Sequence, residues 1–295
     1  MPFQILQHGK YHIMETIGKG GMGKVHLGLH VMLGINIVLK ELLVSNPKDP
    51  SYVKDAIDEF KAEAQLLYAN VRHPAFPTVK DFFEEGGKFY LVMDLMEGAN
   101  MQTLIERFGQ LHVDMVCWIG DRILSGLAYI HRYDIVHKDI KPGNILLNLA
   151  EHRANLVDFG IAKSKVNLSS SSMTPNFAAP EQFKGLNVTT ATDVYQLGAT
   201  MYYAITGKLP KPADKRKDDD LEPFTAFAIK GADRKAATEL FKLVSKALSI
   251  DSSKRWGRHK VPHRSAVMLE SEGMLDDLRR VRHELHVSNN LEEHV

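Results

Sequence analysis

The stretch IVHKDIKPGNILL, residues 135–147, sets two charged side chains and one amide at fixed intervals between apolar flanks. Asp139 offers a carboxylate for the proton of an attacking hydroxyl, Lys141 a cation for developing phosphate charge, and Asn144 an amide oxygen. Asp158, in the later stretch LVDFGIAK, adds a second oxygen ligand at the end of a predicted strand. Because Mg²⁺ prefers oxygen donors and phosphate-bridged sites, these residues together predict metal-assisted chemistry on a phosphate.

Near the N-terminus, the stretch IGKGGMGKV places Gly18, Gly20 and Gly23 in the spacing G-x-G-x-x-G. A dinucleotide-binding fold needs a helix after the third glycine, and a Walker A loop needs Gly-Lys followed by Ser or Thr. Here Val25 opens the alternating stretch VHLGL, which predicts a strand instead. The glycines are therefore expected at the tip of an antiparallel hairpin, where the backbone can pass close over phosphates. Considered alone, the motif is equally consistent with a flexible hairpin that binds no ligand.

Lys40 closes the β-branched stretch INIVLK, and a lysine buried in such a strand is rare without a partner. The next segment, DAIDEFKAEAQLLYANV, has apolar residues at helical spacing and supplies Glu63. An acid on a helix that faces the sheet would hold the Lys40 ammonium in position. Without the other motifs, an ordinary surface lysine is the alternative.

The pattern of the sequence changes near residue 95. Residues 11–94 are mainly strand-like with one helical segment, whereas longer helical patterns follow the stretch MEGAN. In HVDMVCWIGDRILSGLAYIHR, the apolar residues that share one helical face are Val116, Ile119, Ile123, Leu127 and Ile130. We therefore expect an α+β protein with a small antiparallel sheet lobe that carries one helix, followed by a larger, mainly α-helical lobe.

Composition and charge exclude several classes of protein. The 295 residues are 44% hydrophobic and 25% charged, as in ordinary globular proteins with a substantial core. Lys and Arg (37) nearly balance Asp and Glu (36), so no overall field attracts the chain to nucleic acid or to an anionic membrane. The basic stretch KRWGRHKVPHR contains only one aromatic residue, and we interpret it as an insertion between helices rather than a nucleic-acid site.

The N-terminal stretch MPFQILQHGKYHI has no charged segment followed by a long apolar core. No run in the sequence approaches the roughly 18 apolar residues of a membrane span. With a single cysteine, Cys117, the chain forms no internal disulfide, and the apolar neighbours of this residue predict a buried thiol. A reducing, cytoplasmic setting is therefore expected, and a secreted effector with a C-terminal export signal would show the same features.

Together these motifs resemble the eukaryotic-type (Hanks-type) protein kinase family, whose signatures occur here in the family's order. They are the glycine-rich loop, IVLK ending at Lys40, HKD with Asn144, DFG at residues 158–160, and APE at residues 179–181. The resemblance covers residues 11–285 and implies a bilobal protein kinase fold. Its N-lobe would span residues 11–95 and its C-lobe residues 96–285, with a C-terminal tail at 286–295.

The resemblance implies a role for each of the chemical residues. Lys40 would pair with Glu63 and contact the α- and β-phosphates of ATP. Asp139 would orient the hydroxyl of a protein substrate, while Asn144 and Asp158 would hold Mg²⁺. ATP and Mg²⁺ are therefore the expected cofactors.

The resemblance also implies an adenine pocket. Met93 would be the gatekeeper, and backbone groups of the hinge from Asp94 to Met96 would receive the adenine ring. Val38 stands above the ring in place of the usual alanine, which narrows the pocket, and Leu146 would close it from below. The remaining expected contacts with the nucleotide are Ile17, Gly18, Gly20, Gly23, Val25 and Lys40.

Further residues would form the family's structural framework. The spine that couples helix position to the active site would consist of Leu67, Val79, His137 and Phe159. Asp193, in TDVYQLG, would brace the backbone of the catalytic loop. Glu181 of APE would form a structural ion pair with Arg255.

Some positions indicate the acceptor and the regulation. Lys141 and Thr174 follow the Ser/Thr-specific pattern of the family, and several stretches are most similar to its bacterial members. Lys138 replaces the arginine that binds an activation-segment phosphate, and lysine lacks the bidentate fork of arginine. We hypothesise that the serines at residues 169–172 are autophosphorylation sites that dock on Lys138, and a loop without a regulatory role is the alternative. Gly143 stands where kinases with basic substrates carry glutamate, so a basic consensus is not expected.

The leading interpretation is a Ser/Thr protein kinase that transfers the ATP γ-phosphoryl group to protein hydroxyls, its own included. A pseudokinase scaffold is the first alternative, since Lys138 and Val38 depart from the family pattern. A small-molecule phosphotransferase of the aminoglycoside type is the second, although such enzymes generally lack APE and a glycine-rich loop of this kind. The expected partners are protein substrates and a regulatory protein, with no nucleic acid and no membrane segment.

Overall fold

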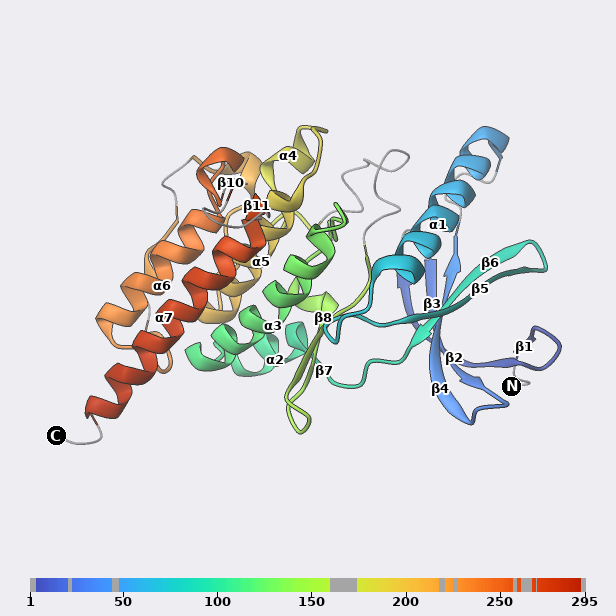
Figure 1. Cartoon of the computed structure of the whole chain (residues 1–295), viewed down its shortest axis with the longest axis horizontal. Coiled ribbons are helices and arrows are strands. Elements are labelled where there is room, and N and C mark those ends of the chain that lie inside the picture. The colour runs from blue at the N-terminus through green and yellow to red at the C-terminus, as the bar shows by residue number, and fades with distance from the viewer. Residues whose placement is uncertain are drawn as a thin grey trace. The chain divides into compact units, whose positions relative to one another are not determined.

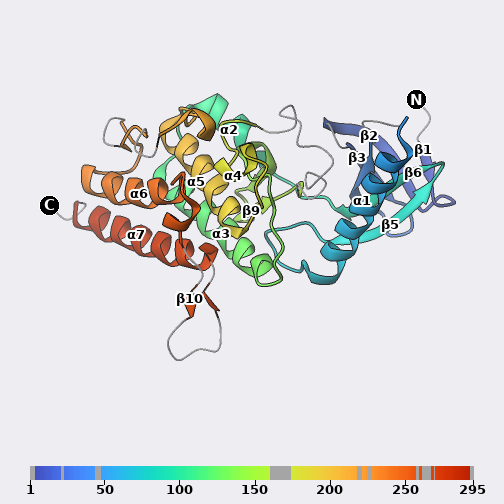
Figure 2. The same cartoon turned by 90° about the horizontal axis from the view of Figure 1, so that it is seen from above.

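The computed structural model describes residues 4–20, 23–43, 48–159, 174–217, 221–224, 228–256, 259–260, 267–268 and 270–292. Their contacts divide them into two compact units. The N-terminal unit comprises the described residues up to Glu97, and the C-terminal unit comprises Gly98–Phe159 and the described residues after position 173. Figures 1 and 2 show the elements of each unit from two directions.

The N-terminal unit is built on one antiparallel sheet, as the alternating sequence predicts. Its strands lie in the order β1-β2-β3-β4-β6-β5. Their bounds are β1 Gln4–Leu6, β2 Tyr11–Gly20, β3 Gly23–His30, β4 Ile35–Leu42, β5 Val79–Glu85 and β6 Lys88–Asp94. Strand β1 lies before residue 11 and is not predicted from the sequence, because its three residues are too few to show an alternating pattern.

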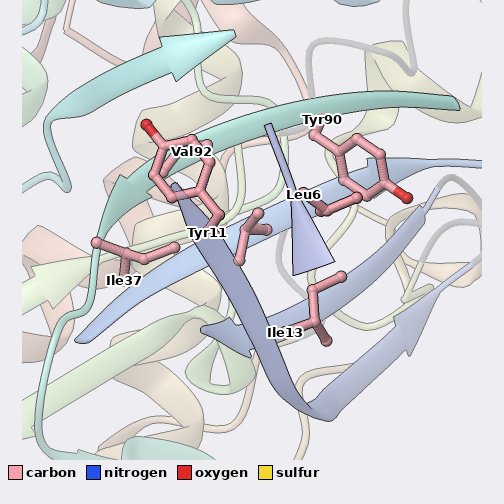
Figure 3. Close-up of a cluster of buried hydrophobic side chains, with 7 residues drawn as sticks. Leu6, Tyr11, Ile13, Ile37, Tyr90 and Val92 are labelled. Atoms are coloured by element: carbon pink, nitrogen blue, oxygen red, sulfur yellow. The ribbon is translucent and has the colours of Figure 1, made fainter. Parts of the chain in front are cut away.

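This sheet curls until strands from its two ends meet. The backbone N–H of Gln7, just after β1, donates to Glu85 Oε2 over 2.7 Å, and the Tyr11 hydroxyl donates to Asp81 Oδ2 over 2.7 Å. We call the concave side the inner face and the opposite side the outer face. The inner face carries the buried cluster of Figure 3, which consists of Leu6, Tyr11, Ile13, Ile37, Leu39, Tyr90 and Val92.

Helix α1, Pro50–Asn70, contacts β5 on the outer face of the same sheet (Figure 1). The carboxylate of Asp49 caps its first turn by accepting hydrogen bonds from two backbone N–H groups, and a proline opens the helix. The Phe60 ring packs on Phe82 of β5 with 5.7 Å between centroids. The predicted helix is confirmed, and of the apolar residues at helical spacing Phe60, Ala64 and Leu67 are buried, while Ile57 is half-buried.

The C-terminal unit is mainly helical, as predicted. Its helices are α2 Met101–Phe108, α3 Val113–His131, α4 Pro180–Phe183, α5 Thr190–Thr206, α6 Arg234–Ala247 and α7 Glu270–Glu292. Strands β7 Ala99–Asn100, β8 Ile145–Asn148 and β9 Arg153–Leu156 form one sheet, and β10 His259–Lys260 pairs with β11 Val267–Met268. Short 3-10 turns lie at Pro142–Asn144, Ala213–Lys215 and Ser252–Lys254.

Helix α5 forms the centre of this unit, because every one of its residues is buried. Helix α3 buries the face that the sequence predicts, namely Val116, Ile119, Ile123, Leu127 and Ile130. The thiol of Cys117 is buried on the same helix, and its burial raises the pKa of this group to about 12. The prediction of a buried, unpaired thiol is therefore confirmed.

The C-terminal helix α7 packs against α3 and α6, as Figure 2 shows for α6. Leu275 and Leu278 of this helix are buried, whereas the side chain of Leu285 lies outside the described residues. Among the helices that the structure describes, none combines the length and the apolar character that crossing a membrane requires.

Candidate active site

The strand register of the N-terminal unit gathers the predicted nucleotide contacts on its outer face. Val25 of β3 is paired with Lys40 of β4, and Val38 of β4 is paired with Met93 of β6. Because side chains two residues apart share a face, Val38 and Lys40 are neighbours there. The next residues along β4, on the inner face, are buried, whereas Val38 and Lys40 keep some accessible surface. Apolar side chains that stay accessible on a rigid sheet are what a flat aromatic ligand requires.

Ile17 occupies a β-bulge just before the glycine-rich turn. Thr16 is paired with His26 and Gly18 with Val25, so Ile17 is the additional residue on β2. A bulge changes the direction in which a side chain points, and Ile17 is 51% exposed. The position of this predicted contact therefore depends on local bulge geometry as well as on regular alternation.

The structure explains the presence of glycine at some positions of the motif and not at others. A Cβ added at Gly23 would lie 2.6 Å from the carbonyl oxygen of Glu41, so the close approach of β4 by itself requires glycine. At Gly18 the nearest atom would be the Val25 Cβ at 3.6 Å, an ordinary contact. Among the described residues, nothing around Gly18 demands a missing side chain, which fits a backbone that a ligand approaches. The backbone of Gly20 ends β2, and its surroundings lie outside the described part.

Lys40 lies near the end of β4 and is half-buried. Glu63 lies in helix α1, but its side chain falls outside the residues that the structure describes. The Lys40–Glu63 ion pair therefore stays a prediction.

The predicted hinge begins at the end of β6. The backbone N–H of Asp94 donates to the Thr78 carbonyl over 3.0 Å, and its carboxylate pairs with Lys80 at 3.0 Å. Met96 lies two residues beyond the strand in irregular chain. Since the Asp94 N–H is already used, the hinge groups that suit an adenine edge are the Asp94 carbonyl and the backbone of Met96.

In the C-terminal unit, three predicted residues form one hydrogen-bonded cluster. Lys141 Nζ lies 3.0 Å from Asp139 Oδ2. Asn144 Nδ2 donates to the same oxygen over 3.0 Å and to the Asp139 carbonyl over 2.8 Å. Asp139 and Asn144 are both buried, so these bonds hold the carboxylate in one orientation.

Asn144 and Asp158, the predicted metal ligands, lie at the same end of the β8–β9 hairpin. Asn144 precedes β8, Asp158 follows β9, and the Val157 N–H donates to the Asn144 carbonyl over 2.9 Å. Because the amide nitrogen of Asn144 is engaged with Asp139, its amide oxygen is the atom that suits a cation. Asp158 has a φ of 61°, a left-handed conformation that is rare for residues other than glycine and common at functional sites. The amide and carboxylate oxygens fit the donor set that Mg²⁺ prefers.

Asp193 of α5 braces the catalytic loop, as the resemblance implies. Its carboxylate accepts the backbone N–H groups of His137 and Lys138, each over 2.8 Å. It also lies 2.8 Å from Nε2 of His131, and both side chains are fully buried. A buried carboxylate with several donors is a rigid anchor, since removing it would leave those donors unsatisfied.

Lys138 has a φ of 69°, and two glutamines that the sequence did not indicate help to hold it there. Its carbonyl accepts hydrogen bonds from Gln196 Nε2 over 2.9 Å and from Gln182 Nε2 over 3.1 Å. Gln196 Oε1 also accepts the N–H of Ile140 over 2.9 Å. A strained residue persists where its surroundings over-determine it, so Asp193 and these amides fix the backbone on both sides of Asp139. Both glutamines come from helices more than forty positions further along the chain, a distance that no local pattern reveals.

Two further framework contacts are confirmed within this unit. The rings of His137 and Phe159 are in contact, with 4.5 Å between centroids and planes tilted by 38°. Arg255 Nη1 lies 2.8 Å from Glu181 Oε1, and the guanidinium is fully buried. Burial by itself raises the pKa of the Glu181 carboxyl, but the hydrogen bonds and charge of Arg255 outweigh it and lower the pKa. The other predicted spine residues, Leu67 and Val79, are buried within the N-terminal unit.

Several predictions fall on other parts of the loop region. Leu146 lies on β8, half-buried between two buried neighbours. The serines at residues 169–172 lie outside the described residues, so their docking on Lys138 stays a hypothesis. At Gly143 a Cβ would meet no atom within 4 Å, so the absence of a glutamate there is not imposed by packing.

The described fold is that of the protein kinases. The solved structure of PpkA-294 in its apo form superimposes with a TM-score of 0.72 at 24% identity, over 94% of this chain and 97% of that one. The solved structure of Rad53 1-466 in complex with AMP-PNP gives a TM-score of 0.64 at 22% identity, over 84% and 62%. The model of the family described as "Protein kinase domain" matches residues 11–266. This chain therefore belongs to the protein kinase domain family, which confirms the resemblance seen in its motifs.

Curated bacterial proteins are the relatives that place it within the family. Serine/threonine-protein kinase B of Synechocystis sp. is 33% identical in an alignment of 221 positions that covers 70% of this chain and 38% of the relative. Serine/threonine-protein kinase pkn2 of Myxococcus xanthus is 32% identical over 86% of this chain and 32% of its own length. PrkC of Bacillus subtilis is 33% identical over 68% and 31%. The chain thus spans about a third of the length of these relatives.

Proposed function

We propose that this chain is a Mg²⁺- and ATP-dependent protein kinase that phosphorylates Ser and Thr hydroxyls of protein substrates, its own included. One observation carries the proposal: the Asp139 carboxylate is held by Lys141 and Asn144 on a backbone anchored by Asp193. Such a carboxylate beside a cation is suited to receive a hydroxyl that attacks a phosphate. The names of the bacterial relatives support Ser and Thr as the acceptors.

Catalysis of this kind consists mainly of positioning and charge stabilisation. Asp139 would accept a hydrogen bond and then the proton of the attacking hydroxyl. A bond forms from that oxygen to the γ-phosphorus while the bond to the β–γ bridging oxygen breaks, so ADP leaves with the electron pair. Lys141 would stabilise the negative charge on the transferred group. Lys40, paired with Glu63, would hold the α- and β-phosphates.

The remaining residues would bind the substrates of this reaction. Asn144 and Asp158 would hold Mg²⁺, which, when bound, neutralises phosphate charge and orients the γ-phosphoryl group. Adenine would lie against apolar side chains and hinge backbone, with contacts from Ile17, Val25, Val38, Asp94, Met96 and Leu146. The backbone at Gly18 and Gly20 would pass over the phosphates.

The test compares Asp139→Asn with Asp134→Asn, using radiolabelled ATP and both autophosphorylation and a Ser/Thr peptide as readouts. Asp134 lies in the preceding turn, is exposed and has a φ of 55° that asparagine tolerates, so its substitution is a matched control. We expect Asp139→Asn to lose about 10²–10⁴-fold in turnover, the contribution of a general base, and Asp134→Asn to keep the wild-type rate.

The same assay separates the alternatives. A wild-type protein that binds ATP but transfers no label to itself, to peptides or to aminoglycosides would be a pseudokinase. A protein that labels aminoglycosides and no peptide would be a small-molecule phosphotransferase. Wild-type turnover by Asp139→Asn would contradict the role of this carboxylate in any of these reactions.

We further propose that the protein works in the cytoplasm and receives its input from a regulatory protein partner. A lone, buried cysteine without a disulfide is compatible with a reducing compartment. Fractionation of the source cells with an antibody against the full chain tests the location.

A further inference from the structure

Four polar side chains form a hydrogen-bonded row across the inner face, at the end of the sheet that carries the glycine-rich turn. Thr16 Oγ1 of β2 lies 3.0 Å from His26 Nδ1 of β3. His26 Nε2 lies 3.2 Å from Glu41 Oε2 of β4. Glu41 Oε1 lies 3.0 Å from Lys88 Nζ of β6. We call this set the inner-face row, and it continues the face on which Figure 3 shows the apolar cluster.

The two central members of the row are buried away from water. His26 is 5% exposed and Glu41 is 2% exposed, whereas Thr16 and Lys88 lie at the exposed ends. Burial by itself raises the pKa of Glu41, but the hydrogen bonds from Lys88 and His26 and the Lys88 charge outweigh it and lower the pKa. A buried carboxylate is stable only when such partners satisfy its oxygens.

The direction of the hydrogen bonds follows from this charge. An ionised carboxylate only accepts, so Nε2 of His26 must donate to Glu41. The other ring nitrogen, Nδ1, is hydrogen-bonded to the Thr16 hydroxyl, which can serve as donor or acceptor. Every member of the row therefore has a partner, and the row links four neighbouring strands by side chains as well as by backbone bonds.

Each member on β2, β3 and β4 is the chain neighbour of a residue assigned to the nucleotide. Thr16 precedes Ile17, His26 follows Val25, and Glu41 follows Lys40. Because successive side chains of a strand point to opposite faces, His26 and Glu41 lie directly behind Val25 and Lys40 on the outer face, while Thr16 adjoins the bulge at Ile17. Thr16 is also the last regular pair before the bulge at Ile17.

The backbone of Glu41 is part of the same arrangement. Its carbonyl oxygen is the atom that a Cβ at Gly23 would meet at 2.6 Å, so β4 and the start of β3 are in close contact here. A shift of Glu41 would change this contact and the pairing of Gly23 with β4. The row is therefore linked, through Glu41, to both the start of β3 and the strand that carries Lys40.

We propose that His26 and Glu41 are positioning residues that hold the glycine-rich hairpin and the Lys40 strand in the geometry that binds ATP. This inference rests on the proposed function, because it names residues that act through the assigned nucleotide contacts. When the row is broken, the bulge at Ile17 and the position of Lys40 are no longer fixed from behind. The affinity for ATP falls, while groups in the C-terminal unit that act on the acceptor hydroxyl are untouched.

A second polar network on the same face provides a matched control. Asp81 Oδ2 accepts from Lys10 Nζ over 2.6 Å and from the Tyr11 hydroxyl over 2.7 Å, which joins β2 to β5. None of these residues is next in sequence to an assigned nucleotide contact. A purely structural effect of breaking an inner-face network should therefore appear equally in Asp81→Asn.

The experiment measures KM for ATP, KM for a peptide, kcat and the unfolding temperature in purified full-length variants. In His26→Phe and Glu41→Gln we expect KM for ATP to rise about tenfold, in line with the loss of a charge-assisted hydrogen bond, and KM for the peptide to stay within about twofold. Asp81→Asn should lower the unfolding temperature and leave KM for ATP at the wild-type value.

A milder pair of variants guards against misfolding of the buried substitutions. Thr16 is exposed, so Thr16→Val removes only the hydroxyl, whereas Thr16→Ser keeps it. We expect KM for ATP to rise in Thr16→Val and to be restored in Thr16→Ser. An unchanged KM for ATP in Thr16→Val and in whichever of the buried variants folds would overturn the inference. So would an equal rise in Asp81→Asn.

Equilibrium binding of Mg²⁺–ATP separates this inference from the proposed function. A wild-type protein that turns over ATP, with variants that bind it equally well, would leave the kinase proposal intact and overturn the role of the row. A wild-type protein that binds ATP without transferring phosphate would overturn the kinase proposal, and weaker binding by the variants would still support the row. A wild-type protein without affinity for ATP would overturn both.

Discussion

The two units position their candidate residues by different physical means. In the N-terminal unit, strand pairing brings Val25 opposite Lys40 and Val38 opposite Met93, so backbone hydrogen bonds set the geometry. In the C-terminal unit, buried side chains that lie 44 to 58 positions away hold an irregular loop through its backbone. In the sheet, pairing sets the positions and the inner-face row supports them from behind, whereas the strained loop depends on buried partners from distant helices.

This difference shows where each unit is vulnerable. Lys138 and Asp158 have positive φ values in the C-terminal unit, each costing about 1–3 kcal/mol that the surroundings must offset. The outer-face residues of the sheet have ordinary extended conformations and lose only their own contacts when changed. Substitutions in the loop should therefore disturb its backbone conformation, whereas substitutions of outer-face residues in the sheet should remove only a contact with the nucleotide.

The largest effect is expected at Asp158, which is both a proposed Mg²⁺ ligand and a residue with a strained, positive φ. Asp158→Ala removes a carboxylate ligand, and we expect Mg²⁺-dependent turnover to fall by at least about a thousandfold. A titration of activity against Mg²⁺ at fixed ATP checks this result. Asp134→Ala is the control, and near wild-type activity in Asp158→Ala would contradict the metal assignment.

A smaller loss, without damage to the fold, is expected on the sheet. Lys40→Met keeps an unbranched, apolar stem at a half-buried position and removes one cation from the phosphates. We expect kcat/KM to drop by about 10²–10³-fold, with an unchanged thermal unfolding midpoint. Lys24→Met, on the neighbouring strand, is the matched control. A large loss of stability in Lys40→Met would contradict the expectation that outer-face residues of the sheet lose only their own contacts when changed.

The anchoring of the loop can be tested without touching a chemical group. Gln196→Leu removes the amide that holds the Lys138 carbonyl and the Ile140 N–H. We expect kcat to fall about tenfold and KM for ATP to stay constant, because the carboxylate of Asp139 loses its fixed orientation. Stopped assays over a range of ATP concentrations give both constants. Gln196→Glu keeps an acceptor for Ile140 and should recover part of kcat, whereas equal kcat in all three proteins would contradict the anchoring role.

The smallest effect concerns pH and the edge of the sheet. Burial by itself raises the pKa of Asp81, but hydrogen bonds from Lys10 and Tyr11 outweigh it and lower the pKa below the usual 3.8. A lowered folded-state pKa contributes stability above the unfolded pKa, and this contribution is lost as pH falls through the folded pKa. Since Lys10 is 43% exposed, the contribution should stay below about 1 kcal/mol. Urea unfolding of wild type and Asp81→Asn between about pH 6 and about pH 3 measures it, and curves that do not converge at the acid end would contradict this account.

The sequence predicts the sheet unit almost completely. Alternation locates β3, a β-branched stretch locates β4, helical spacing locates α1, and the order of motifs assigns Lys40 to its strand. These features depend on periods of two and 3.6 residues, which a short window contains. Strand β1 escapes because it is shorter than such a window, although it closes the inner face.

The loop of the C-terminal unit is predicted in its chemistry and only partly in its support. Asp139, Lys141 and Asn144 form the expected cluster, and Asp193 is expected through the family resemblance. Gln182 and Gln196 give no comparable signal in the sequence. A single neutral amide on a helix belongs to no periodic pattern, and the backbone that it binds lies far away in the chain. The roles of these two glutamines become visible only in the hydrogen bonds of the folded structure.

The unequal glycines of the nucleotide motif bear on how activity is judged in related chains. The close approach of the neighbouring strand requires glycine at position 23. A related chain that no longer binds ATP should therefore keep this glycine as long as the sheet folds. Gly18 has no such structural obligation, and a side chain there would be tolerated once no ligand approaches. In a survey of degenerate copies of this domain, the first glycine is therefore the informative position, and the third reports only that the sheet is still present.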